Sequence, residues 1–90
     1  MKVISVNAIP DFKLHVVFDD GVSGVVDLKV FIQHGLFTDL KDEQLFSKVY
    51  TTGYSIAWSD ELEIDAINIY AEILNKTPEE ILSALSYAAN

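Results

Sequence analysis

The chain has 90 residues, no cysteine, and 14 acidic against 6 basic side chains, all six of them lysine, so its formal net charge is −8. The lack of cysteine excludes disulfides, thiolate metal ligands and a cysteine nucleophile, and it fits a reducing compartment, so we expect a cytoplasmic protein. Because the chain is acidic and has no arginine, nucleic acid and anionic membranes are disfavoured as direct partners.

The first third of the chain has the period of β-strands. Apolar and polar residues alternate over 2–9 and 12–18, and Pro10-Asp11 is the expected turn between these two runs. Asp20-Gly21 then forms a two-residue hairpin signal, because glycine tolerates the positive φ that such turns require. The hairpin leads into a third strand at about 22–27.

The middle of the chain predicts two short helices followed by a return to strands. Asp27 can cap a helix that ends at Gly35, and Asp42 can cap a second helix. The segment YSIAW (54–58) alternates large and small residues, which is typical of a strand. A hairpin through 59–61 is expected to join it to the next strand.

The last quarter predicts two helices. Asp65 begins a helical run, and Thr77-Pro78-Glu79-Glu80 has the pattern of a capping box for a final helix from about 78 to 88. Two helices joined by a short turn also outline a helix-turn-helix. The final helix carries no Lys or Arg, however, so it would present negative charge to DNA. A helical pair that packs on the sheet or on a partner is the better interpretation.

Together these elements predict one α+β domain over residues 1–90, with a small antiparallel β-sheet of about five strands, short helices and a C-terminal helical pair. Half of the residues are apolar, which is high for so short a chain, so we expect part of the apolar surface to meet another chain. The expected core positions are Val6, Leu14, Val16, Phe18, Leu28, Phe31, Leu45, Phe46, Ile56, Trp58, Ile69 and Leu85.

Three segments occur in an order and spacing that resemble a bacterial family known as domain of unknown function 2442. They are FDDGVSGVVDL (18–28), GLFTDLKDEQLFSKV (35–49) and GYSIAWSDELEIDAINIY (53–70). The resemblance covers about residues 2–70 and leaves 71–90 as a C-terminal helical extension. It implies a small antiparallel sheet with short helices. Members are often encoded beside another small protein, in an arrangement similar to a toxin and antitoxin pair.

One segment, WSDELEID (58–65), gathers four carboxylates directly after the only tryptophan. It lacks the glycine of a calcium loop, its first two carboxylates fall in an expected exposed turn, and Asp65 is placed to cap a helix. We therefore expect no metal site and no catalysis there, and a carboxylate-based metal-binding or catalytic site around 58–65 is the alternative. The candidate patch consists of Trp58, Asp60, Glu61, Glu63, Asp65 and Tyr70.

The chain has no nucleophile elbow and no phosphate loop, and we expect structural or surface roles for His15 and His34. The expected function is a non-enzymatic protein–protein interaction module without cofactor or metal, in its sharpest form an antitoxin-like acidic partner of a small neighbouring protein. Its partner is another protein chain, either a second copy or the product of the neighbouring gene. The candidate interface consists of Ile81, Leu82 and Leu85.

Overall fold

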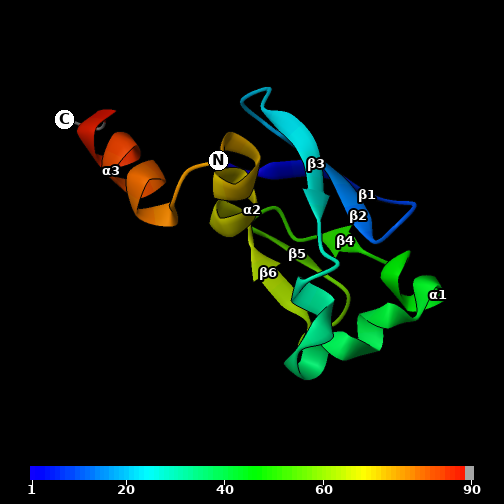
Figure 1. Ribbon diagram of the computed structural model, residues 1–90. Helices are drawn as coiled ribbons and strands as arrows, with labels where there is room; N and C mark the ends of the chain where they lie inside the picture. Colours follow the sequence, from blue (N-terminus) through cyan, green and yellow to red (C-terminus); the bar gives the residue numbers. More distant parts are fainter. Residues whose placement is uncertain (89–90) are drawn as a thin grey trace.

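The computed structural model describes the backbone of residues 1–88 and the side chains of residues 1–83. It contains two three-stranded antiparallel sheets, short helices between them and two helices at the C-terminal end (Figure 1). The α+β class is therefore confirmed. The strands form two small sheets, however, and not one sheet of about five strands.

The first sheet consists of β1 (Val3–Ile9), β2 (Lys13–Phe18) and β3 (Ser23–Asp27), in that spatial order. Along the central strand β2, half-buried and fully buried residues alternate. Successive side chains of a strand point to opposite faces, so every second residue of β2 enters the core. The alternation in the sequence predicted this strand correctly.

The β2–β3 hairpin is confirmed, but its loop has three residues and not two. The Phe18 N–H donates to the Val22 carbonyl (2.8 Å), and the Gly21 N–H donates to the Phe18 carbonyl (3.1 Å). Gly21 has a φ of 89°, as expected for glycine at the end of a three-residue hairpin loop. The prediction of a two-residue loop was wrong because Asp19 joins Asp20 and Gly21 in the loop.

Two 3₁₀-helices, η1 (Phe31–Gln33) and η2 (Gly35–Lys41), and the short α1 (Glu43–Phe46) connect the two sheets. The predicted cap of α1 is confirmed, since the Asp42 side chain accepts a hydrogen bond from the Gln44 N–H (3.0 Å). The helix expected directly after β3 is only the single turn of η1. Such short turns leave few residues to define a buried face.

The second sheet consists of β4 (Tyr50–Thr51), β5 (Ser55–Ala57) and β6 (Glu63–Asp65). All three residues of β5 are buried. The two sheets meet where the Val3 N–H donates to the Gly53 carbonyl (2.7 Å). This contact joins the start of β1 to the turn between β4 and β5.

Two helices complete the chain, α2 (Ala66–Leu74) and α3 (Pro78–Ala88). Asp65 stands at the N-cap of α2, but its side chain makes no capping hydrogen bond, so that part of the prediction was wrong. The capping box of α3 is confirmed. The Glu80 N–H donates to Thr77 Oγ1 (3.2 Å), and the Thr77 N–H donates to Glu80 Oε1 (3.4 Å).

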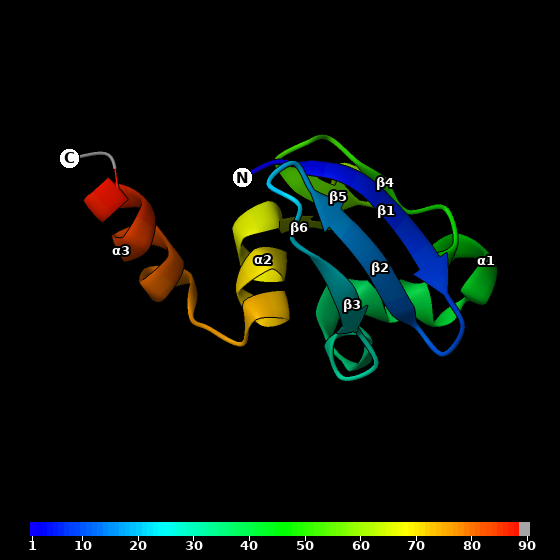
Figure 2. The ribbon, with the colours of Figure 1, turned by 90° about the horizontal axis from the view of Figure 1, so that it is seen from above.

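The molecule is elongated, with extents of 45 × 23 × 23 Å, because α3 extends to one side of the body (Figure 2). In both views α2 lies between β3 and α3.

Helix α2 packs closely on the first sheet at Gly24 of β3. A Cβ added there would lie 2.9 Å from Cγ2 of Ile73. Glycine therefore lets α2 approach β3.

Most of the predicted core positions are confirmed. Val6 and Leu45 are half-buried against the core, and Leu85 lies outside the described residues. The prediction that Phe31 is a core residue was wrong, since Phe31 is 44% exposed while its neighbour Ile32 is 1% exposed. The confirmed buried positions are Leu14, Val16, Phe18, Leu28, Phe46, Ile56, Trp58 and Ile69. Further buried positions, outside the list of expected core positions, are Val3, Val26, Ile32, Leu40, Leu62 and Ile64.

Candidate protein-binding groove

Trp58, the first residue of the predicted patch, is a core residue. It is 6% exposed, and its indole N–H donates to the carbonyl of Phe46 (2.9 Å). The indole also packs against the Phe46 ring, with the centroids 5.8 Å apart. Burial and a satisfied indole N–H are what a structural tryptophan requires. The Trp58 side chain therefore belongs to the core.

The four carboxylates of the same patch lie at the surface of the β5–β6 hairpin. Asp60, Glu61, Glu63 and Asp65 are all exposed, whereas Trp58 is buried. Among the residues that the structure describes, no three His, Asp or Glu side chains are placed to hold a metal ion. The acidic segment therefore has the geometry of a solvated hairpin.

Tyr70, the last residue of the predicted patch, belongs to a contact between α2 and the β2–β3 hairpin. Its hydroxyl donates to the carboxylate of Asp20, and its ring lies 4.8 Å from the ring of Phe18. The hydrogen bond to the carboxylate raises the pKa of the Tyr70 hydroxyl and lowers the pKa of Asp20. This pair connects two elements of the fold, away from the acidic segment.

An open groove of about 730 Å³ lies between α2, the end of β3 and the η1–η2 segment. One side comes from α2, the opposite side from η1 and η2, and β6 contributes to the lining through Ile64. Most of the lining is apolar. We call this the apolar groove; its lining residues are Val26, Asp27, Leu28, Val30, Phe31, His34, Gly35, Leu36, Phe37, Ile64, Asn68, Ile69 and Glu72.

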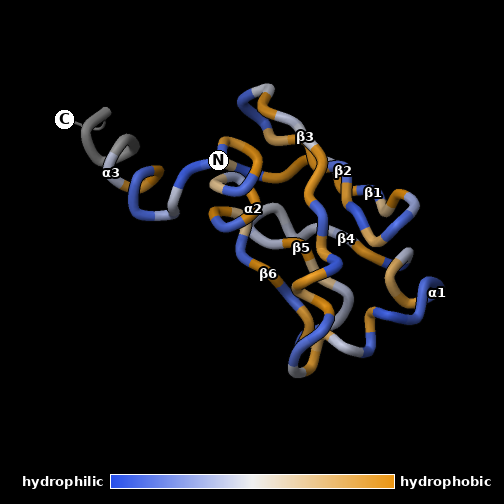
Figure 3. The backbone as a smooth tube through the Cα atoms, viewed as in Figure 1, coloured by the Kyte–Doolittle hydropathy of each residue, from blue (hydrophilic) through white to orange (hydrophobic). Residues whose placement is uncertain are grey.

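The apolar side chains at the edge of the groove are open to solvent. Val30 is 78% exposed, Leu36 64% and Phe31 44%. The ring of Phe31 packs on Phe37 at the surface, with the centroids 4.6 Å apart, and does not enter the core. Figure 3 shows the corresponding hydrophobic stretches in the segment that follows β3. Several large apolar side chains gathered at one exposed place mark an interaction surface.

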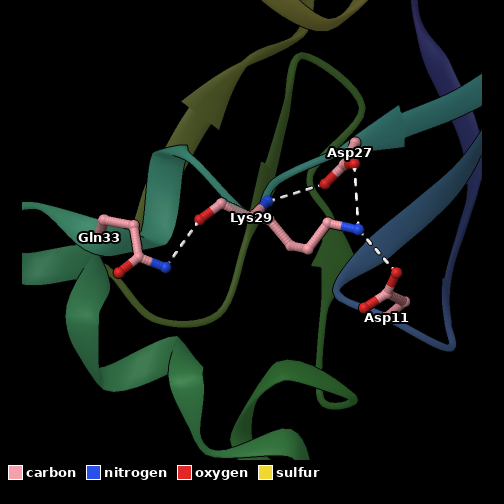
Figure 4. Close-up of polar contacts among 4 residues, drawn as sticks. All are labelled: Asp11, Asp27, Lys29 and Gln33. Atoms are coloured by element: carbon pink, nitrogen blue, oxygen red, sulfur yellow. Dashed lines mark hydrogen bonds and ion pairs between the residues drawn. The ribbon is translucent and has the colours of Figure 1, made fainter.

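A polar brace holds the corner between β3 and η1 at the edge of the groove (Figure 4). Lys29 Nζ lies 2.6 Å from Asp11 Oδ2 and 3.4 Å from Asp27 Oδ2. The Lys29 N–H also donates to Asp27 Oδ1 (2.9 Å), and Gln33 Nε2 donates to the Lys29 carbonyl (3.0 Å). These contacts tie the groove wall to the β1–β2 turn.

The brace also shifts the pKa values of two of its members, Asp27 and Lys29. The pKa of Asp27 is lowered, first because its carboxylate accepts the Lys29 backbone N–H. The pKa of Lys29 is raised, first because its ammonium group donates to Asp11. Asp11 and the next residue, Phe12, have positive φ values of 72° and 57°, which is uncommon for residues other than glycine. The ion pair between Lys29 and Asp11 joins this turn to the corner between β3 and η1.

The sequence analysis did not find the apolar groove. It placed Phe31 in the core and located the candidate interface on the last helix. There, Ile81 is 6% exposed and hence buried within this chain, Leu82 is 55% exposed, and the side chain of Leu85 lies outside the described residues. The available signal was the concentration of apolar residues in the segment 28–37, which is too short a stretch to bury all of them.

The family model described as protein of unknown function (DUF2442) matches residues 3–75. This chain belongs to that family. The DUF2442 match includes all of α2, beyond the limit expected near residue 70, and ends before α3. Every lining residue of the apolar groove lies within it. Neither curated proteins nor solved structures give a significant match to this DUF2442 protein. No helix among its described residues has the length and apolar character needed to cross a bilayer.

Proposed function

We propose that this protein is a non-enzymatic interaction module that binds another protein chain through the apolar groove. The observation that carries the proposal is the exposure of Val30 and Leu36, which are 78% and 64% exposed beside the groove. Exposed aliphatic side chains that adjoin a concave apolar surface gain stability when a second chain covers them.

The chemistry of the lining supports binding and not catalysis. Asp27 is held by hydrogen bonds and by Lys29, and its pKa is lowered, whereas a general acid or base near neutral pH needs a pKa close to the working pH. The other polar side chains of the lining are His34, Asn68 and Glu72. They lie among apolar residues, as the orienting groups of a binding surface do.

The sharper form of the proposal is an antitoxin-like acidic protein that covers a basic small protein encoded next to it. Two features support it: the net charge of −8 and the gene arrangement that the family resemblance implies. Opposite charges on two partners speed their association and disfavour wrong partners. The acidic hairpin around Glu61 then contributes to the long-range field and not to a site of its own.

Co-expression with the product of the adjacent gene tests this proposal. Size-exclusion chromatography with light scattering would detect the complex, and titration of the separated proteins would give its affinity. We expect the double variant Val30→Ser, Leu36→Ser to bind at least about 10-fold more weakly, because burying one large aliphatic side chain contributes about 1.5–3 kcal/mol. Both residues are exposed, so the variant should remain folded.

The matched control is Ile4→Ser. Ile4 is 60% exposed and lies on β1, outside the groove lining. This variant should bind like the wild type. Full affinity of the double variant would show that the complex, if formed, uses another surface, and the absence of any complex with the adjacent gene's product would remove the antitoxin-like form.

A further inference from the structure

We infer that the occupant of the apolar groove is an amphipathic helical segment with basic flanking residues, contributed by a protein other than a second copy of this chain. This inference rests on the proposed function and adds the chemistry of the partner. It follows from three features of the groove: the exposed apolar edge, the groups that form its walls, and the charge around it.

The exposed edge requires an occupant that extends beyond the cavity. A small molecule confined to about 730 Å³ would contact Val30 and Leu36 only on the side that lines the groove, and the outer surface of these highly exposed side chains would stay in water. A chain segment that crosses the groove covers both the cavity and the edge. The exposed side chains therefore point to a macromolecular occupant.

The walls favour a helix over an extended strand. An added strand binds mainly through backbone hydrogen bonds at a free sheet edge, whereas a helix binds through a stripe of side chains laid into an apolar groove. Here, the Ile32 and Gln33 N–H groups already donate to the Leu28 and Val30 carbonyls. The η1 wall thus offers side chains and few free backbone groups, as does the helical face formed by Ile69 and Glu72 of α2. Strands β3 and β6 stand at the edges of their sheets, but β3 lines the groove with only its last two residues and β6 with only one, too few for an added strand to pair along.

The charge around the groove indicates basic flanks. Glu72 lines the groove and forms no ion pair with any described side chain, whereas Asp27 is already paired with Lys29. The whole chain adds a net charge of −8. Lys or Arg residues beside the apolar stripe of the partner would complement Glu72 and the surrounding field.

The same charges argue against a second copy. The helix that extends from the body, and that a second copy could offer, is α3, which begins with Glu79 and Glu80 and has no Lys or Arg from Pro78 to its end. Placing it in the groove would bring these carboxylates into the field of Glu72 and of another chain with a net charge of −8. Like charges brought together cost affinity.

The test uses the full chain and a synthetic peptide of about 18 residues, a length at which a helix can form in water. The peptide carries Leu and Phe at helical spacing on one face and Lys on both flanks. Binding is followed by NMR of the labelled protein. Trp58 is the only tryptophan, so its indole N–H gives a single resolved signal, and its ring lies 6.4 Å from Phe37 of the groove lining.

Two control peptides separate shape from charge: one has the same composition with the apolar residues scrambled around the helix, and the other has Glu in place of Lys. We expect the basic peptide to shift the signals of the groove residues. The scrambled and acidic peptides should bind at least about 10-fold more weakly at low salt, where exposed charges are least screened. Glu72→Gln should weaken the basic peptide about two- to fivefold, as for an exposed ion pair.

Glu43→Gln is the matched control for charge, since Glu43 is exposed on α1 and does not line the groove. Equal binding of the acidic peptide, equal binding of the scrambled peptide or no binding of the basic peptide would overturn the inference. So would groove signals that shift with protein concentration alone, because they would reveal a second copy in the groove. The basic peptide could fail to bind while the Val30→Ser, Leu36→Ser variant still weakens the complex with the co-expressed partner. That result would overturn the inference about the helical occupant and leave the proposed function supported.

Discussion

Two segments of this protein, one acidic and one apolar, differ in how well they suit a binding site. The acidic segment is the more conspicuous in the sequence, but the apolar segment is the more unusual in the structure. The acidic segment 58–65 attracts attention because of its four carboxylates and its tryptophan, yet it is an ordinary hairpin anchored by a buried indole. The segment 28–37 has the sequence of a short core-covering helix, yet it exposes Val30, Phe31 and Leu36 at a groove. The second segment is the better candidate for function.

The comparison shows that exposed apolar side chains are a better guide to a binding surface than a cluster of charged side chains. Carboxylates on a hairpin are fully solvated, so their presence needs no partner to explain it. Large apolar side chains in water lose the stabilisation that burial would give them, about 25 cal/mol per Å². An exposed group of them on a small domain therefore calls for an explanation.

The largest effect that tests this comparison is expected at Trp58. Trp58→Ala should reduce the free energy of unfolding by about 3–5 kcal/mol, because it leaves a cavity beside Phe37 and Phe46 and removes the donor to the Phe46 carbonyl. Urea unfolding followed by circular dichroism measures this change, since the variant has no tryptophan fluorescence. A loss below about 1 kcal/mol would show that Trp58 is not part of the core.

A smaller effect is expected at Gly24, where α2 packs on β3 and so sets the far wall of the groove. Gly24→Ala should cost about 1–3 kcal/mol, because the new methyl group would meet Ile73 at 2.9 Å. The double variant with Ile73→Ala should lose less stability than the sum of the two single changes. Ser23→Ala, at an exposed neighbouring position, is the control. Strict additivity would contradict the close contact.

The strands of the fold were largely predictable because their signal is local. Alternation over residues 2–9 and 12–18 specifies which side chains face the core, and Gly21 specifies a turn. The arrangement into two sheets was not predictable. It depends on contacts between distant residues, such as the hydrogen bond from Val3 to Gly53, for which the sequence carries no periodic pattern.

The groove was hidden for a related reason. Phe31 and Ile32 are adjacent apolar residues, and which of them enters the core depends on a single turn of 3₁₀-helix. A helix of several turns repeats its apolar stripe and thereby identifies the buried face, but a three-residue turn contains no repeat. The exposure of the acidic turn at Asp60 and Glu61 was predicted correctly, because the solvation of a charged turn does not depend on the rest of the fold.

The smallest expected effect concerns Tyr70, the member of the predicted patch that joins α2 to the β2–β3 hairpin instead. Tyr70→Phe removes the hydrogen bond to Asp20 and should lower the melting temperature by no more than a few degrees near pH 7. Tyr54→Phe, at a tyrosine that is 71% exposed, is the matched control and should melt like the wild type.

The dependence of this difference on pH follows from the two pKa shifts. The pKa of Asp20 is lowered from 3.8, so its share of the stability is present above pH 3.8 and is lost as the pH falls through the lower pKa of the folded state. The pKa of Tyr70 is raised from 10.0, so its share is present below pH 10 and is lost as the pH rises through the higher folded value. The melting temperatures of wild type and Tyr70→Phe should therefore differ most between about pH 5 and 9 and converge at both extremes. A difference that does not change with pH would show that the hydroxyl contributes only through packing, and that the pair does not fasten α2, the wall of the groove, to the hairpin.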